Sequence, residues 1–287
     1  DSTLTSDEAL SFVDLNLNDF TLTLGSLTSD LTIKNAITID TSTEGISTGD
    51  ADLKLNSVLT MNDGLIDSTG GTFVLGGDFV KSGGTLTTSQ TNLELTDSIT
   101  LTSDEALSFV TLNLNYKTLT LGSATSDLTV IDNLTISTST EGISTGGADF
   151  ISLGSLDISD GSVTSTSGVV SLLAGGQLSG SGELDLSGST WVLGDDFLKS
   201  SGTLTISQTD FKLEGDSTLT SDEALSFVDL NLNDFTLTLG SLTSDLTIKN
   251  AITIDTSTEG ISTGDADLKL NSVLTMNDGL IDSTGGT

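Results

Sequence analysis

The stretch that decides the fold is residues 31–61, LTIKNAITIDTSTEGISTGDADLKLNSVLTM. Aliphatic and polar residues alternate here in short pairs: Leu31 and Ile33, Ile37 and Ile39, Leu53 and Leu55, and Leu59 and Met61. A period of two places the apolar side chains on one face of a β-strand. The stretch therefore predicts a series of short strands, each burying one face and separated from the next by a polar turn.

Equivalent apolar residues recur along the chain at steps of mostly 19 to 24 residues. They sort into three columns: Leu15, Ile37, Leu59, Phe79, Ile99 and Leu119; Leu22, Ile46, Leu65, Leu86 and Leu107; and Leu31, Leu53, Phe73, Leu93 and Leu112. Glycines between the strands, as at residues 62–64, 70–71 and 83–84, supply corners, and the absence of Pro suits strands that are all internal to a ladder. The columns predict an all-β, three-sided parallel β-solenoid of about 20 residues per coil.

A long repeat organises the chain. Residues 1–72 recur unchanged at 216–287, and residues 3–13 recur unchanged at 100–110, so the sequence units are 1–97, 98–215 and 216–287. We expect one continuous solenoid fragment over residues 1–287. The second unit is 21 residues longer than the first, mainly around residues 172–189, and this excess is expected to be one added coil.

The 97-residue unit is not a whole number of coils, so equivalent residues of successive units are expected on different sides of the solenoid. Leu15, for example, falls in the first column, whereas its counterpart Leu112 falls in the third. The alternative fold is a row of separate β-sandwich domains of roughly 100 residues, which also show alternating strands and turn signals. Such domains normally carry longer loops, some Pro and more aromatic residues.

Composition excludes several functions. The net charge of −33 disfavours binding to nucleic acid or an anionic membrane surface, because both require a basic surface. No apolar run approaches the roughly 18 residues of a membrane helix, so membrane insertion is not expected. The chain also has no Cys, no His and no Arg, and the lack of Cys removes disulfides, thiolate metal sites and cysteine nucleophiles.

Two phrases of the sequence carry a resemblance. Leu112-Asn113-Leu114-Asn115 followed by Thr118-Leu119-Thr120-Leu121-Gly122, and Gly84-Thr85-Leu86-Thr87, resemble the β-strand repeats of large bacterial surface proteins, the autotransporter passengers and filamentous-haemagglutinin-like adhesins. The likeness covers the whole chain and lies in the style and length of the repeat. It implies a right-handed parallel β-helix, secretion, and a role in adhesion or surface structure.

Catalysis is not expected. Some solenoids are polysaccharide-active enzymes, but their sites combine carboxylates with Arg, Lys or His, and two of these three are missing here. A carboxylate pair can cleave a glycosidic bond, and Asp195 with Asp196 or Asp7 with Glu8 are the nearest candidates. Adjacent residues on a strand point to opposite faces, however, and at a corner they are usually solvated.

The sequence does not require any cofactor, and calcium is the one cofactor for which it offers candidate ligands. Hard oxygen ligands on turns suit this ion. The candidate ligands are acidic residues near predicted corners: Asp7, Glu8, Asp50, Asp52, Asp104 and Glu105. Neither the Gly-Gly-x-Gly-x-Asp repeat nor an EF-hand loop occurs, and the alternative is that these acids simply keep a long fibre soluble.

Thr-x-Thr pairs raise ice binding as an alternative function, since flat threonine ladders on a solenoid can match ice. The pairs occur at 3/5, 21/23 and 41/43 and again at 100/102, 118/120 and 138/140, but the columns assign the two sets to different sides. We expect instead a structural protein, the shaft of a long extracellular fibre, filament or surface adhesin. Its partners would be other copies of itself, end to end or laterally, or a cell surface or glycan.

Overall fold

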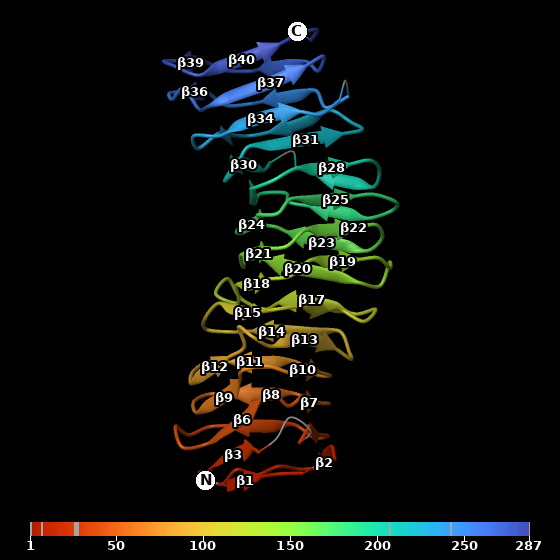
Figure 1. The fold of residues 1–287 in the computed structure, drawn as a ribbon, viewed down its shortest axis with the longest axis vertical. Helices are drawn as coiled ribbons and strands as arrows, with labels where there is room; N and C mark the ends of the chain where they lie inside the picture. The colour runs from red at the N-terminus through yellow and green to blue at the C-terminus, as the bar shows by residue number, and fades with distance from the viewer. Residues whose placement is uncertain (1, 7, 26–28, 207, 242, 287) are drawn as a thin grey trace. The chain divides into compact units, whose positions relative to one another are not determined.

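The structure is a computed structural model that describes residues 2–6, 8–25, 29–206, 208–241 and 243–286. These residues form two compact units, one made of residues 1–132 and 140–144 and the other of residues 133–139 and 145–287. In each unit the chain winds as a parallel β-solenoid with three short strands per coil (Figure 1). The predicted fold class is therefore confirmed: every strand pair given for the described residues is parallel.

The first unit contains three long hydrogen-bonded stacks of strands and one further strand pair. The first stack is β1 (Ser2–Leu4), β3 (Thr21–Leu24), β6 (Gly45–Gly49), β9 (Leu65–Ser68) and β12 (Thr85–Thr87). The second is β2 (Leu10–Phe12), β4 (Leu31–Ile33), β7 (Leu53–Leu55), β10 (Thr72–Leu75), β13 (Asn92–Leu95) and β16 (Leu112–Asn113). The third is β5 (Ile37–Ile39), β8 (Leu59–Met61), β11 (Phe79–Lys81), β14 (Ile99–Thr102), β17 (Thr118–Leu121) and β20 (Gly142–Gly146), and β15 (Leu107–Phe109) pairs with β18 (Leu128–Val130).

The second unit repeats this organisation. One stack is β19 (Leu134–Ile136), β22 (Leu156–Ile158), β25 (Gly176–Leu178), β28 (Phe197–Lys199), β31 (Ser217–Ser221), β34 (Thr236–Leu239), β37 (Gly260–Gly264) and β40 (Leu280–Ser283). Another is β21 (Phe150–Ser152), β24 (Val169–Leu172), β27 (Thr190–Leu193), β30 (Asp210–Leu213) and β33 (Leu230–Asn231). Shorter stacks are β23 (Ser162–Ser165), β26 (Glu183–Asp185) and β29 (Thr203–Thr205); β32 (Leu225–Phe227), β35 (Leu246–Ile248) and β38 (Leu268–Leu270); and β36 (Ile252–Ile254) with β39 (Leu274–Met276).

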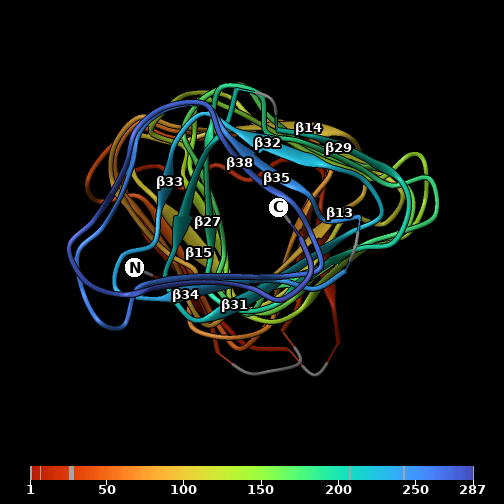
Figure 2. The same cartoon turned by 90° about the horizontal axis from the view of Figure 1, so that it is seen from above.

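Seen from above, the stacks of the second unit lie on different sides of the coil (Figure 2). β27 and β33 superimpose on one side, β31 and β34 on a second, and β32, β35 and β38 on a third. Because side chains alternate along each strand, every side sends one row inward. The inward rows of the coils stack into an apolar core in which Phe73, Phe150 and Trp191 are at most 2% exposed.

The predicted columns agree with the observed register in part. In the first column Ile37, Leu59 and Phe79 pair in turn, but Phe79 then pairs with Leu101 and not with the predicted Ile99, and Leu15 lies outside the strands. In the second column the step from Leu86 to Leu107 is not observed, because β15 pairs with β18.

The third column is confirmed at every step, since Leu31 pairs with Leu53, then Phe73, Leu93 and Leu112. In the second column Leu65 is wrong: Ile66 pairs with Ile46 and is 1% exposed. β9 begins directly after Gly64, which takes a positive φ, so which of Leu65 and Ile66 turns inward depends on the geometry of that corner and could not be counted from the sequence alone.

The predicted change of side between sequence units is also confirmed. β3 pairs with β6 in the first stack of the first unit, whereas its copy β17, 97 residues later, pairs with β20 in the third stack. The reason is that 97 residues are not a whole number of three-strand coils. The same sequence therefore forms the same strand on a different side.

Corners are made in two ways. Gly64 has a φ of 81°, and a Cβ there would lie 2.4 Å from the carbonyl oxygen of Glu44, so the corner excludes a side chain. The second kind has two consecutive non-glycine residues at positive φ, Asn115 at 49° and Tyr116 at 66°. The Asn115 N–H donates to the side chain of Asn113, and the same corner recurs in the other copies at residues 18–19 and 233–234. Asn tolerates this conformation better than most residues.

The 21 extra residues of the second sequence unit form one added coil. β21 pairs with β24 and β24 with β27, whereas the equivalent strands of the first sequence unit, β7 and β10, pair directly. The other two sides gain β25 and β26 in the same way. Residues 169–189 thus enter the stack without changing the register of the coils around them.

Deleting residues 169–189 should therefore leave a folded solenoid that is one coil shorter. Gly168 would then precede Thr190, the same Gly-Thr junction as Gly71-Thr72. We expect an unchanged β-sheet circular dichroism spectrum and a melting temperature lowered by less than about 5 °C, because stability is nearly a sum over coils. Deleting residues 169–179, about half a coil, should abolish cooperative unfolding. Equal behaviour of the two deletions would contradict the added-coil interpretation.

Candidate functional site

Two lysines point into the core. β11 and β28 each follow an in-out-in pattern, and Lys81 and Lys199 occupy the second inward position, where each is 2% exposed. A lysine can take such a position because its methylene stem packs with apolar neighbours while the ammonium reaches the corner. The ammonium must then find acceptors there, because an unpaired buried charge is strongly unfavourable.

An acidic pair in the next coil supplies these acceptors. The Nζ of Lys81 lies 2.5 Å from Oδ1 of Asp104 and 3.0 Å from Oε1 of Glu105. Twenty-three residues separate Lys81 from Asp104, which is one coil. Lys199 repeats the arrangement with Asp222 and with Glu223, whose Oε1 lies 3.2 Å from the ammonium. We call each set of three residues a lysine clamp, because it ties two successive coils together by charge.

The clamp changes the titration of its members. Burial alone would lower the pKa of Lys81, but the hydrogen bonds and negative charges of Asp104 and Glu105 outweigh it and raise the pKa above its ordinary value of 10.5. The same holds for the pKa of Lys199. The hydrogen bond from Lys199 lowers the pKa of Asp222 below 3.8.

These shifts fix the pH range of the clamp. Stability from the raised lysine pKa is fully present below 10.5 and is lost as the pH rises through the folded-state value. Stability from the lowered pKa of Asp222 is present above 3.8 and is lost as the pH falls through its folded-state value. The clamp therefore stabilises the fold across the neutral range.

The candidate calcium ligands are dispersed. Asp104 and Glu105 hold a cation, but it is the Lys81 ammonium. Glu8 and Asp50 are exposed, and Asp7 lies outside the described residues. Among residues 2–6, 8–25, 29–206, 208–241 and 243–286, no three acidic side chains gather closely enough to hold a metal ion. Calcium binding thus stays a prediction.

Asp52 belongs to a different structural set, the corner caps. Its Oδ1 accepts a hydrogen bond of 2.7 Å from the N–H of Thr72, twenty residues later. Where the ladder turns a corner, such a carboxylate replaces a missing backbone carbonyl of the coil below. The cap recurs through Asp30, Asp78, Asp149, Asp196, Asp216 and Asp245, at distances of 2.7 to 3.0 Å.

The weak catalytic candidates belong to this corner chemistry. Asp196 caps the N–H of Thr218 at 2.7 Å, and Asp195 accepts the N–H of Asp196 at 2.8 Å. Both residues are exposed. Their contacts account for them as turn residues, which gives no support to a glycosidase pair.

The threonine pairs do not form a uniform face. Thr3 stacks on Thr23, but Ser47 and Asp67 follow at the same position. Residues 41–43 form a corner and are not part of a strand. The second set lies in another stack, where Thr100 pairs with Thr120, as the sequence predicts. Thr87 continues the row of the first set beyond Asp67, so a carboxylate interrupts the hydroxyl groups and no regular hydroxyl lattice forms.

Sequence reasoning missed both the clamps and the caps. The clamp had a signal: an apolar-x-Lys strand precedes Asp-Glu by one coil length in two copies, at Lys81 with Asp104 and at Lys199 with Asp222. The alternation of the strand also places each lysine inward. The caps had a weaker signal, since Asp precedes many strands but the acceptor geometry depends on how each corner turns.

Comparison with known proteins adds no relative: no protein-family model, curated protein or solved structure matches this chain. Within the described part of the chain, no helix is long and apolar enough to cross a membrane. Functional inference therefore rests on the geometry above.

The clamp predicts an asymmetry between its two ends. Asp222→Asn with Glu223→Gln leaves the Lys199 ammonium buried without a counter-charge, and we expect a loss of about 1–3 kcal/mol in the free energy of unfolding, less than is typical of a fully buried pair. The two carboxylates are 45% and 52% exposed, which moderates the loss. Lys199→Met keeps the packed stem and frees two hydrated acids, so its cost should stay below about 1 kcal/mol.

Chemical denaturation at pH 7 and at pH 11 would measure these differences. The penalty of the double amide variant should shrink at pH 11, where the lysine more readily loses its proton in that variant. Glu214→Gln, at the half-exposed pair of Lys212 and Glu214, is the matched control and should cost less than about 0.5 kcal/mol. Equal penalties for Lys199→Met and the double amide variant would mean that leaving the ammonium without a counter-charge carries no cost of its own, which would contradict the predicted asymmetry.

Proposed function

We propose that the chain is a segment of the shaft of an extracellular fibre or surface adhesin, built by tandem duplication and without catalytic activity. The observation that carries the proposal is the added coil at residues 169–189, which lengthens the stack while the strands around it keep their register. A fold that accepts whole coils in this way can grow in length without a new design. Each duplication of the 215-residue repeat would then make the shaft longer.

The use of the charged groups supports this proposal. Acidic side chains cap corners, as Asp52 does, or clamp lysines, as Asp104 does, and these roles hold coils together. The remaining acids give a surface that repels other acidic polymers and keeps a long repetitive protein soluble. Such a surface suits an extracellular or cell-surface location, and other copies of the chain are its proposed partners.

The dimensions of the proposed shaft can be tested. A continuous stack with coils about 4.8 Å apart would add roughly 50 Å for each 215-residue repeat, and the 287-residue chain would measure roughly 60 Å along the stack. Small-angle X-ray scattering of the chain and of a version carrying one more 215-residue repeat should show this increment at constant cross-section. A compact particle whose cross-section grows with length would contradict the shaft.

Calcium dependence is a separate test. Without a specific site, Ca²⁺ and Mg²⁺ should raise the melting temperature equally, because both only screen the surface charge. Thermal unfolding in Ca²⁺, Mg²⁺ and chelator would measure this. A rise in Ca²⁺ that Mg²⁺ does not reproduce, and that Asp50→Asn with Asp52→Asn removes, would assign those residues to a calcium site.

A further inference from the structure

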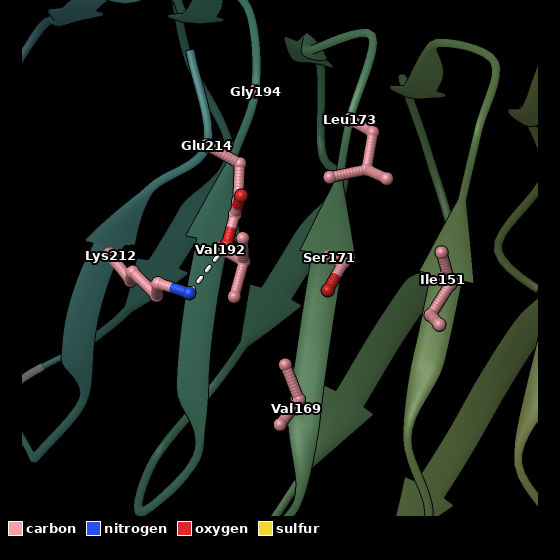
Figure 3. A pocket seen from close by; sticks show the side chains of 8 residues that line it. All are labelled: Ile151, Val169, Ser171, Leu173, Val192, Gly194, Lys212 and Glu214. Carbon is pink, nitrogen blue, oxygen red and sulfur yellow. Dashed lines mark hydrogen bonds and ion pairs between the residues drawn. The ribbon is translucent and has the colours of Figure 1, made fainter. Parts of the chain in front are cut away.

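One outer face of the second unit is unusually apolar. Strands β21, β24, β27 and β30 lie side by side, and their outward side chains line a shallow groove of about 480 Å³ (Figure 3). The lining residues are Ile151, Val169, Ser171, Leu173, Val192, Gly194, Lys212 and Glu214. We call this surface the aliphatic face.

The register explains how the face is assembled. Ile151, Ser171, Val192 and Lys212 stand opposite one another on successive strands and form one outward row. Ser171 and Val192, in the middle of this row, are only 8% and 7% exposed, so the accessible aliphatic groups of the face lie around them. Leu173, which follows β24, is 36% exposed, and Leu153, which follows β21, is 43% exposed. Gly194 has no side chain, so a hollow remains between Leu173 and Glu214 (Figure 3).

Internal duplication shows that the fold does not require aliphatic residues at positions 151 and 153, whereas Val192 keeps the valine of its counterpart Val74. Ile151 and Leu153 replace Lys54 and Asn56 of the first sequence unit, and Lys212 replaces Glu94. β7 forms the same strand with Lys54 in the outward position, between two buried leucines. The replacements therefore leave folding unchanged and alter only what the face presents to the outside.

The charge of the face is also exceptional for this chain. Lys212 and Glu214 form an ion pair of 2.5 Å, and the other six lining residues are uncharged, so the groove carries no net charge on a chain of net charge −33. Two copies of such an acidic chain repel each other over most of their surfaces. Repulsion is weakest where two neutral aliphatic faces meet.

We propose that the aliphatic face packs against the same face of a second copy of this chain. Two flat sheet faces can approach to about 10 Å with their outward side chains interdigitated. Leu173 and Leu153 would then leave water, and Lys212 and Glu214 would stand at the rim. This inference rests on the proposed function, the shaft. It adds to that function the surface through which two shafts would associate side by side.

The contact is weak by itself. Four strands about 4.8 Å apart give a face of roughly 200 Å², well below the roughly 800 Å² per partner of a stable interface. A single pair of faces thus gives transient association. In a continuous fibre the face would return to the same side with every third 215-residue repeat, and several weak contacts acting together bind far more tightly than one.

Sedimentation velocity and X-ray scattering of the 287-residue chain up to about millimolar concentration would test the proposal. We expect reversible dimers that become more abundant from 50 to 500 mM NaCl, because salt screens repulsion between acidic surfaces but not apolar contact. The variant Ile151→Lys, Leu153→Asn and Lys212→Glu restores the residues of the first sequence unit. It should weaken dimerisation at least tenfold.

The design separates specific from general effects. The triple variant changes the net charge of −33 by one unit only, and circular dichroism should confirm its fold. Leu198→Thr, on the exposed outer side of β28, removes a similar aliphatic group from another stack and should not change dimerisation. A wild-type chain that stays monomeric in both salts, or a triple variant that dimerises as well as wild type, would overturn the proposal. A chain that scatters as an elongated monomer would overturn the proposed association of two copies but would still agree with the proposed shaft.

Discussion

The structure depends on one constraint, the in-register stacking of each coil on the one below. Parallel ladders require every strand to place its N–H and C=O groups opposite those of the same strand in the neighbouring coil. The same register stacks inward side chains, as in the row Leu31, Leu53, Phe73, Leu93 and Leu112. Coil length may vary only at the corners, since an odd shift within a strand would turn its apolar side chains outward.

Charged groups serve this constraint at the points where the ladder is interrupted. A corner leaves backbone N–H groups without a carbonyl, and an aspartate such as Asp52 supplies the acceptor. Lys81 and Lys199 fill core positions with their stems and are neutralised only by acids of the next coil. Both devices act between coils one turn apart, so each depends on the same stacking that the apolar rows establish.

Much of the fold could be predicted because apolar rows repeat with the coil. Most strand positions and sides, and the added coil, follow from the spacing of Leu, Ile, Val and Phe. The exchange of Leu65 for Ile66 could not be predicted, since both are apolar and follow directly on the corner at Gly64, where a positive φ redirects the chain. The lysine clamps were missed for a related reason. The alternation of apolar and polar residues assigns charged side chains to the outside, and an inward lysine becomes plausible only when its acidic partners in the next coil are known. Residue-level function was less accessible, because an outward row such as Ile151, Ser171 and Val192 is scattered in the sequence.

The repeat length has a geometric consequence for any surface feature. From β3 to its copy β34 the chain counts 31 strands, which is ten coils of three strands and one strand more. In a continuous stack each 215-residue repeat would therefore present its aliphatic face one side further round the solenoid, and the fourth repeat would return to the first side. Copies joined through these faces would meet neighbours in three directions. In the proposed fibre, lateral contact of that kind would build a network of shafts and not a flat sheet, because the strand count, and not the sequence of the face, would set the direction of each contact.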